Sequence, residues 1–170
     1  MSTVRRQIDA PPERVWAVLS DADSYAHWVV GSRDTRDADP RFPAEGTSFH
    51  HTVAFGPIDL RDETEVVESD APRRLVLHVK ARPLGRAKVQ IDLSADSGGT
   101  RVTMREGPES LIARLVYNPL ADLLLRGRND EALRRLATLA EGEHPEPRTS
   151  HNAGRGAGSG EEGPAVGPER

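Results

Sequence analysis

Polar and apolar residues alternate with a period of two through most of residues 29–106, a pattern that predicts a series of β-strands. Short turn sequences such as "DAPR" and "SGG" separate these runs, so neighbouring strands are expected to pair antiparallel as a meander. The stretch "TVRRQI" supplies a further strand at the start, which makes about seven in all. The remaining strands are expected at 29–36, 46–55, 58–69, 74–82, 86–96 and 100–107.

Helical spacing replaces this alternation near both ends of the chain. After Asp9 or Ala10 as N-cap, "PPERVWAVL" reads as a first helix, and a second short helix opens at Ser20 or Asp21 and ends near Trp28. A short helix is also possible in "PESLIARLVY". The chain therefore reads as α+β, and its curved antiparallel sheet needs a helix to cover one apolar face.

A long C-terminal helix supplies that cover. Asn118 is its expected N-cap, Pro119 takes its first position, and Gly142 ends it. Its inner stripe follows i, i+3, i+4 spacing and comprises Leu125, Asn129, Ala132, Leu133, Leu136 and Ala140. If the sheet curls round this helix without closing on it, an interior cleft remains between them, and function is expected there.

Composition narrows the choice of protein class. The 170 residues read as one domain over 1–141, followed by a Gly/Pro-rich tail at 142–170 that is predicted to be disordered. A net charge of −4 and 4% aromatic residues disfavour nucleic-acid binding. With no signal sequence and no apolar run long enough to span a bilayer, a cytoplasmic location is expected, and the oligomeric state stays open.

Alternation also separates the polar residues of the stretch "TSFHHTVAFGPIDLRDETEVV" into two faces. His51 shares the parity of Phe49 and Val53, and Asp62 shares that of the apolar positions on the next strand, so both point inward. If the hairpin turns at residues 56–57, each residue of the first strand pairs with the residue of the second strand for which the two residue numbers add up to about 113. His51 and Asp62 then lie directly opposite, close enough to hydrogen-bond. Glu106 falls on the inner side of the last strand.

Four segments carry a resemblance to a known family: "IDAPPERVWAVLSDADSYAHWV", "DAPRRLVLHVKARPLGRAKVQIDL", "GGTRVTM" and "RNDEALRRLATLAE". Together they resemble the START-like helix-grip superfamily, in particular the polyketide cyclase/dehydrase-type (SRPBCC) proteins. The resemblance implies a curved sheet wrapped around the C-terminal helix, with an apolar cavity that holds lipids, polyketides or similar molecules. Its motifs specify the fold far better than the ligand.

Strand alternation and the family resemblance together give the candidate site residues. His51, Asp62 and Glu106 are candidates for proton transfer, whereas no cofactor is expected. A metal site is disfavoured, because adjacent His50 and His51 point to opposite faces and the chain has no cysteine. The expected ligand-lining residues are Trp28, Phe49, Val53, Leu77, Val79, Val89, Ile91, Met104, Leu125 and Asn129.

Three functions remain open at this point. The first is binding of a small hydrophobic ligand such as a lipid or polyketide, without chemistry. The second is a cyclase or dehydratase that uses the inward polar residues for proton transfer. The third is a protein-interaction module on the same fold. For His51 and Asp62, a self-satisfied polar pair without catalytic function is the structural alternative.

Overall fold

The computed structural model describes residues 2–55, 58–81, 85–109 and 119–142, which form the α+β arrangement expected from the sequence. The short helix expected around 108–117, the Asn118 cap and the tail fall largely or wholly outside these residues. The strands are β1 (Ser2–Ile8), β2 (Ser32–Arg36), β3 (Ser48–Phe55), β4 (Ile58–Asp70), β5 (Arg74–Ala81), β6 (Gly85–Asp96) and β7 (Gly99–Pro108). The helices are α1 (Pro12–Leu19), the 3₁₀ helix η1 (Ala22–Ser24), α2 (Tyr25–Trp28) and α4 (Pro119–Glu141).

One seven-stranded antiparallel sheet, in the order β1-β7-β6-β5-β4-β3-β2, forms the body of the protein. β2 to β7 follow one another as the predicted meander, and β1 pairs with β7 at the other edge. Gly99 permits that last pairing, because a Cβ at this position would lie 2.1 Å from the carbonyl oxygen of Ile8. A bulge between Val66 and Glu68 shifts the register of β4 against β5.

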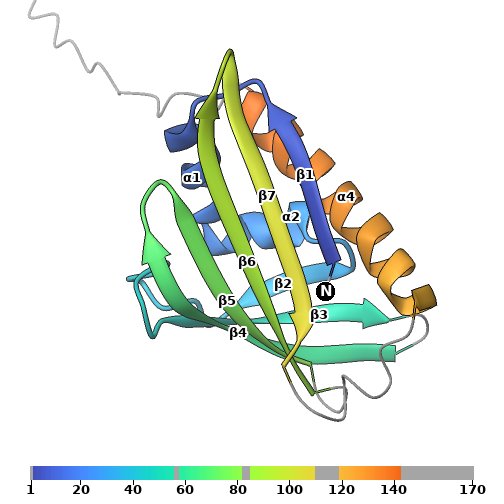
Figure 1. Ribbon diagram of the computed structural model, residues 1–170. Coiled ribbons are helices and arrows are strands. Elements are labelled where there is room, and N and C mark those ends of the chain that lie inside the picture. Colours follow the sequence, from blue (N-terminus) through green and yellow to red (C-terminus); the bar gives the residue numbers. More distant parts are fainter. Residues whose placement is uncertain (1, 56–57, 82–84, 110–118, 143–170) are drawn as a thin grey trace, which may run out of the picture.

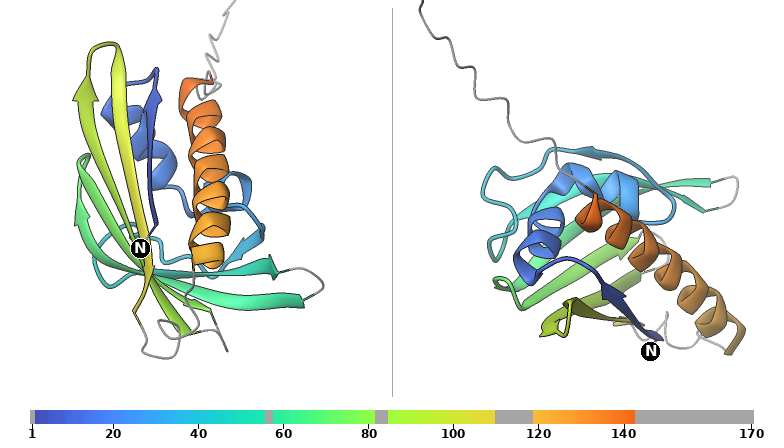
Figure 2. Two further views of the ribbon diagram at one scale, coloured as in Figure 1. Left: turned by 45° about the vertical axis from the view of Figure 1, so that its right-hand side comes forward. Right: turned by 90° about the horizontal axis from the view of Figure 1, so that it is seen from above.

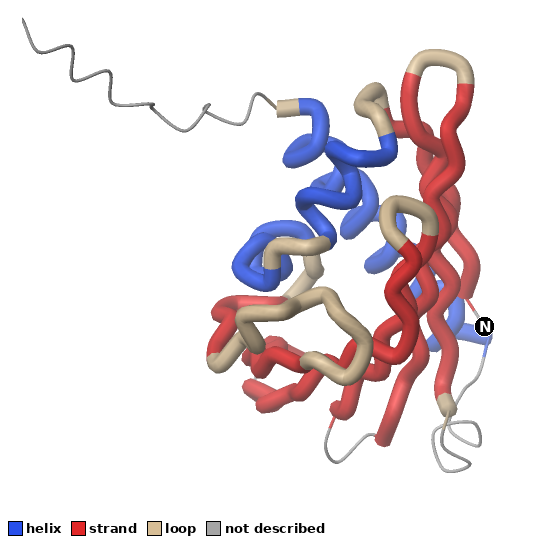
Figure 3. Tube along the Cα trace, turned by 90° about the vertical axis from the view of Figure 1, so that its left-hand side faces the viewer, coloured by secondary structure: helices blue, strands red, loops and turns tan. Residues whose placement is uncertain are grey.

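All the helices lie on one side of the curved sheet, as Figures 1 and 3 show. In Figure 2, α4 runs along this inner face, beside β1 and the small helices. Two hydrogen bonds fix its C-terminal end: the Asp9 amide donates to Glu141 Oε1 at 2.9 Å, and Arg14 Nη2 donates to the Gly142 carbonyl at 3.3 Å. The end of α4 is therefore held where β1 passes into α1.

The first helix begins later than the sequence pattern suggested. Its N-cap is Pro11, in an extended conformation, rather than Asp9 or Ala10. A residue that precedes a proline is excluded from the helical region by steric clash, so Pro12 forces Pro11 to stay outside the helix. The N-cap of η1 is Asp21, one of the two residues expected from the sequence, and its side chain accepts a hydrogen bond from the Asp23 amide at 3.0 Å.

The part of the interior under the C-terminal half of α4 is filled by aliphatic side chains, and we call it the aliphatic end. Leu133 and Leu136 of the predicted stripe are fully buried there. They belong to one buried cluster with residues of α1 and the sheet, including Val15, Leu19, Leu75, Ile91, Leu93 and Val102. Further along α4 towards its N-terminus, Leu123 and Leu124 are about two-thirds exposed, at 65% and 67%.

The outer face of the sheet carries paired charges. Lys80 Nζ lies 3.0 Å from Glu63 and 3.2 Å from Glu65, and Asp92 pairs with both Arg74 and Arg105. Val76 is on this face, as alternation predicted, yet it is buried between cross-strand neighbours with long polar side chains. In the described residues no helix is long and apolar enough to cross a membrane.

Candidate functional site

His51 is buried on the inner face of β3. Its Nδ1 lies 3.4 Å from Ser32 Oγ and its Nε2 lies 3.4 Å from Thr64 Oγ1, while the ring meets Phe49 edge-on. Burial, and to a smaller extent the nearby positive charge of Arg128, lower the pKa of His51 to about 4, although the carboxylate of Asp34 acts in the opposite direction. The imidazole is therefore neutral at pH 7, with one nitrogen accepting a hydrogen bond and the other donating one.

Asp62 lies directly opposite His51 in the β3–β4 register, as predicted, and is equally buried. Among the described residues, however, the two side chains form no hydrogen bond. His51 bonds to hydroxyl groups instead, and the carboxylate atom Oδ1 of Asp62 is buried without any partner. Burial raises the pKa of Asp62 to about 6, although Arg128 acts in the opposite direction.

Glu106 is buried on the inner face of β7, but it is not a neighbour of this pair. β5 and β6 separate β7 from β4 in the sheet. Its ion partner is Arg128, whose Nη1 lies 3.8 Å from Glu106 Oε1. The three residues expected to transfer protons therefore divide into a pair on β3–β4 and a separate ion pair between β7 and α4.

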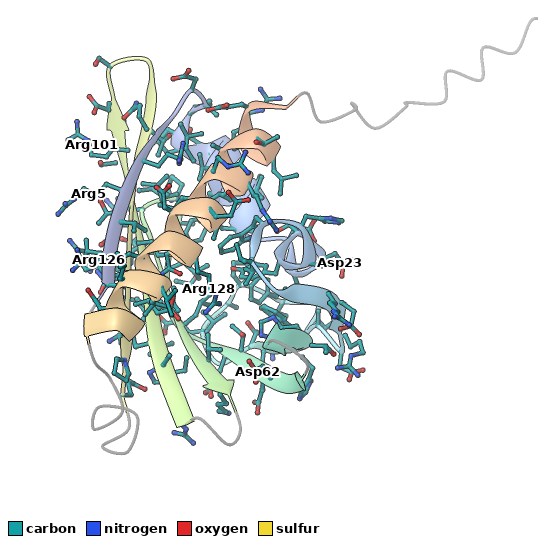
Figure 4. All side chains as sticks on the ribbon, turned by 90° about the vertical axis from the view of Figure 1, so that its right-hand side faces the viewer. Arg5, Asp23, Asp62, Arg101, Arg126 and Arg128 are labelled. Atoms are coloured by element: carbon teal, nitrogen blue, oxygen red, sulfur yellow. The ribbon has the colours of Figure 1, made fainter. Side chains whose placement is uncertain are left out.

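Arg128 is the residue that sequence reasoning missed. It is the charged group on α4 that acts on His51, Asp62 and Glu106 together. Figure 4 places it on the side of α4 towards the strands with Asp62, whereas Arg126 lies towards β1. The sequence did contain a sign of this position. Arg128 precedes the buried Ala132 by four residues, so the two lie along the same side of the helix.

Two further buried polar groups lie on the helices. Asn129 on α4 is 2% exposed, and its Nδ2 has no hydrogen-bond partner in the described part of the chain. Trp28 at the end of α2 is 3% exposed, and its Nε1 is likewise unpartnered there. Both are donors, and buried donors without partners are rare in folded proteins. We call the buried residues His51, Asp62, Thr64, Glu106 and Asn129, together with the exposed Arg128 that acts on them, the polar end of the interior.

The expected apolar lining divides between core and partly open positions. Phe49, Leu77, Ile91 and Met104 belong to the buried core cluster, whereas Val79, Val89 and Leu125 are only half-buried. The side chain of Val53 lies outside the described residues. By register, Val89 lies opposite both Leu77 and Glu106, and Val79 lies opposite Thr64. The half-buried positions on the sheet thus adjoin the polar end.

The arrangement does not resemble a metal centre. Within the described residues, no three His, Cys, Asp or Glu side chains are grouped closely enough to hold an ion. His50 is exposed on the outer side of β3, where Nδ1 lies 3.9 Å from Asp37. What the polar end offers chemically is a neutral imidazole beside a carboxyl group of raised pKa, two groups suited to accepting and donating protons.

A family profile and several solved structures match this chain. A family profile described as "Polyketide cyclase / dehydrase and lipid transport" matches residues 2–141. No curated protein matches the chain. A solved structure from Rhodobacter sphaeroides is similar, with a TM-score of 0.66 and 20% identity over 82% of this chain and 90% of that one. Another from Chromobacterium violaceum has a TM-score of 0.63 and 19% identity, covering 84% and 100%.

A third similar structure is DynU16, described as a protein of the dynemicin biosynthetic locus. It has a TM-score of 0.59 and 20% identity, and the match covers 82% of this chain and 46% of that one. At these identities the structural matches establish the fold alone, and the family profile extends through the whole sheet and α4. The chain therefore belongs to the polyketide cyclase/dehydrase and lipid transport family, with the helix-grip architecture that its sequence resembles.

Proposed function

We propose that the protein binds a small hydrophobic molecule between the inner face of the sheet and the N-terminal half of α4. The observation that carries this role is that three of the buried side-chain atoms without a hydrogen-bond partner among the described residues are Asp62 Oδ1, Asn129 Nδ2 and Trp28 Nε1. They come from β4, α4 and α2. Polar groups of this kind orient a ligand whose apolar surface contacts aliphatic side chains such as Val79, Val89 and Leu125.

A neutral hydrophobic fluorophore, N-phenyl-1-naphthylamine, tests this role in the full chain. Leu125→Trp places a large ring at a half-buried lining position, and Leu124→Trp places the same ring at an exposed neighbour. We expect the wild type to bind the probe, Leu125→Trp to bind it at least about tenfold more weakly, and Leu124→Trp to behave as wild type. Absence of binding to the wild type, or equal binding by the two variants, would refute the proposal.

A second candidate function is cyclisation or dehydration of a poly-ketone. The observation favouring it is the opposed pKa shifts of His51 and Asp62, which occupy facing positions. Neutral His51 would take a proton from a carbon next to a ketone. The resulting enolate would form a carbon–carbon bond with a second ketone, and protonated Asp62 would donate its proton to the alkoxide that results.

Turnover of an aromatic poly-ketone substrate tests this chemistry. His51→Gln and Asp62→Asn should each lower the rate by at least about 100-fold, while Asp23→Asn at an exposed position leaves it unchanged. The reaction needs neutral His51 and protonated Asp62, so the rate should be highest between pH 4 and 6. A rate that is unaffected by both substitutions rules out this role.

A further inference from the structure

Asp62 is the starting point, because its charge has no counter-ion among the described residues. Glu106 has Arg128 at 3.8 Å, whereas Asp62 takes part in no ion pair there and its Oδ1 accepts no hydrogen bond. An ionised carboxylate with an oxygen that accepts no hydrogen bond from the protein is costly to bury. The site therefore contains an acceptor that is unsatisfied in the protein alone.

Neither His51 nor Arg128 fully satisfies the Asp62 carboxylate. Both nitrogens of His51 face hydroxyl groups, Ser32 on one side and Thr64 on the other, so the imidazole is not available to Asp62. Arg128 lowers the pKa of Asp62, but burial outweighs it and the pKa still rises. The charge of Arg128 thus compensates that of Asp62 only in part.

The charges of the polar end leave one negative charge in excess. At pH 8 His51 is neutral, Glu106 and Arg128 offset each other, and Asp62 is ionised. An anionic ligand would add a like charge beside Asp62, which is unfavourable in a poorly hydrated site. A protonated amine would supply both the missing charge and a hydrogen-bond donor for Oδ1.

We infer that the hydrophobic ligand of this protein carries a positively charged amine, with the Asp62 carboxylate as its counter-ion. This inference rests on the proposed binding function and adds the chemical class of the ligand. The aliphatic part of the molecule contacts the half-buried side chains Val79, Val89 and Leu125. Asn129 Nδ2 and Trp28 Nε1 remain available to acceptor atoms elsewhere on it.

Three matched fluorescent probes test the inference at pH 8: dansylcadaverine, its N-acetylated neutral form, and dansyl-aminohexanoic acid. They share one fluorophore and a similar alkyl chain but carry positive, zero and negative charge. We expect the wild type to bind the amine at least about tenfold more tightly than the acetylated form, and the acid most weakly. Asp62→Asn should abolish the preference for the amine, whereas Asp23→Asn at an exposed position should retain it.

The outcomes separate this inference from the function on which it rests. If N-phenyl-1-naphthylamine fails to bind, the binding function itself is refuted. If that probe binds but the wild type prefers the neutral or the anionic dansyl probe, or does not discriminate among the three, the amine inference is refuted alone. If Asp62→Asn does not fold, carboxyl NMR of the wild type decides, because the pKa of Asp62 must fall when the amine binds.

Discussion

The two ends of the interior under α4 are built on different principles. At the aliphatic end, side chains such as Leu75, Ile91, Leu133 and Leu136 are fully buried and leave no polar atom to satisfy. At the polar end, the same sheet and the same helix bury His51, Asp62 and Asn129, and among the described residues two of these have atoms without a hydrogen-bond partner. The first arrangement supplies stability, while the second lowers stability at the positions that we propose recognise a ligand.

α4 shows the same contrast along its length. Its C-terminal half buries Leu133, Leu136 and Ala140, and hydrogen bonds from Asp9 and Arg14 hold its end. Its N-terminal half carries the exposed Leu123 and Leu124 and presents Arg128 and Asn129 at the polar end. The C-terminal half therefore fixes the helix on the sheet, and the described part of the N-terminal half is more exposed.

The largest expected effect tests the aliphatic end. Leu136→Ala should lower the free energy of unfolding by about 2–5 kcal/mol, because it removes buried methyl groups and leaves a cavity. Leu124→Ala, in the exposed part of the same helix, should change it by no more than about 0.5 kcal/mol. Urea unfolding measures both values. Similar losses in the two variants would contradict the contrast between the halves of α4.

His51 should make stability fall in acid. Its pKa is lowered in the folded state, so its contribution is fully present above pH 6.5 and is lost as the pH falls through 4. A shift from 6.5 to about 4 corresponds to about 3 kcal/mol. His51→Gln should remove this part of the pH dependence, as measured by urea unfolding between pH 7 and pH 4. If the variant lost as much stability as the wild type between pH 7 and pH 4, this would argue against a buried neutral imidazole.

Asp62 should act with the opposite sign. Its pKa is raised in the folded state, so its stabilising contribution is present below pH 3.8 and is lost as the pH rises through 6. Asp62→Asn removes the buried charge and should increase stability at pH 8 by up to about 3 kcal/mol, with the gain shrinking towards pH 4. Thermal and urea unfolding at several pH values measure this gain. A variant that is less stable than wild type at pH 8 would show that the carboxylate is well satisfied.

The smallest effect concerns Arg128. Arg128→Met keeps the aliphatic stem but removes the charge, so the pKa of His51 and that of Asp62 should both rise. NMR titration of the imidazole and carboxyl signals measures the two shifts. Arg126→Met, towards β1, serves as the matched control and should leave both values unchanged (Figure 4). Equal pKa shifts in the two variants would show that Arg128 does not act specifically on His51 and Asp62.

Much of this fold could be read from local patterns. Strand alternation assigned Phe49, His51 and Thr64 to the inner face, and residues 56–57 as hairpin tip gave the pairing of His51 with Asp62. The inner stripe of α4 was also correctly predicted through Asn129 and Leu136. Such features depend on residues close in sequence, because periodicity and turn chemistry act over one or two elements.

The candidate site was less predictable, since it depends on where elements lie in space. The predicted meander already separates Glu106 from Asp62 by two strands, but nothing in the order of residues places Glu106 next to Arg128. That ion pair depends on how α4 lies over the strands. Likewise, pairing in register did not produce a His51–Asp62 hydrogen bond, and the ring nitrogens face the hydroxyl groups of Ser32 and Thr64 instead.

The sequence by itself thus determined the family, the order of elements and which residues face inward. Tertiary structure alone decided which inward groups are satisfied and which are not. The physical reason is that burial and hydrogen-bond partners come from elements far apart in the chain. Asp62 is an inward acid by its position in β4, but only the packing of β3, β4 and α4 leaves its Oδ1 without a partner.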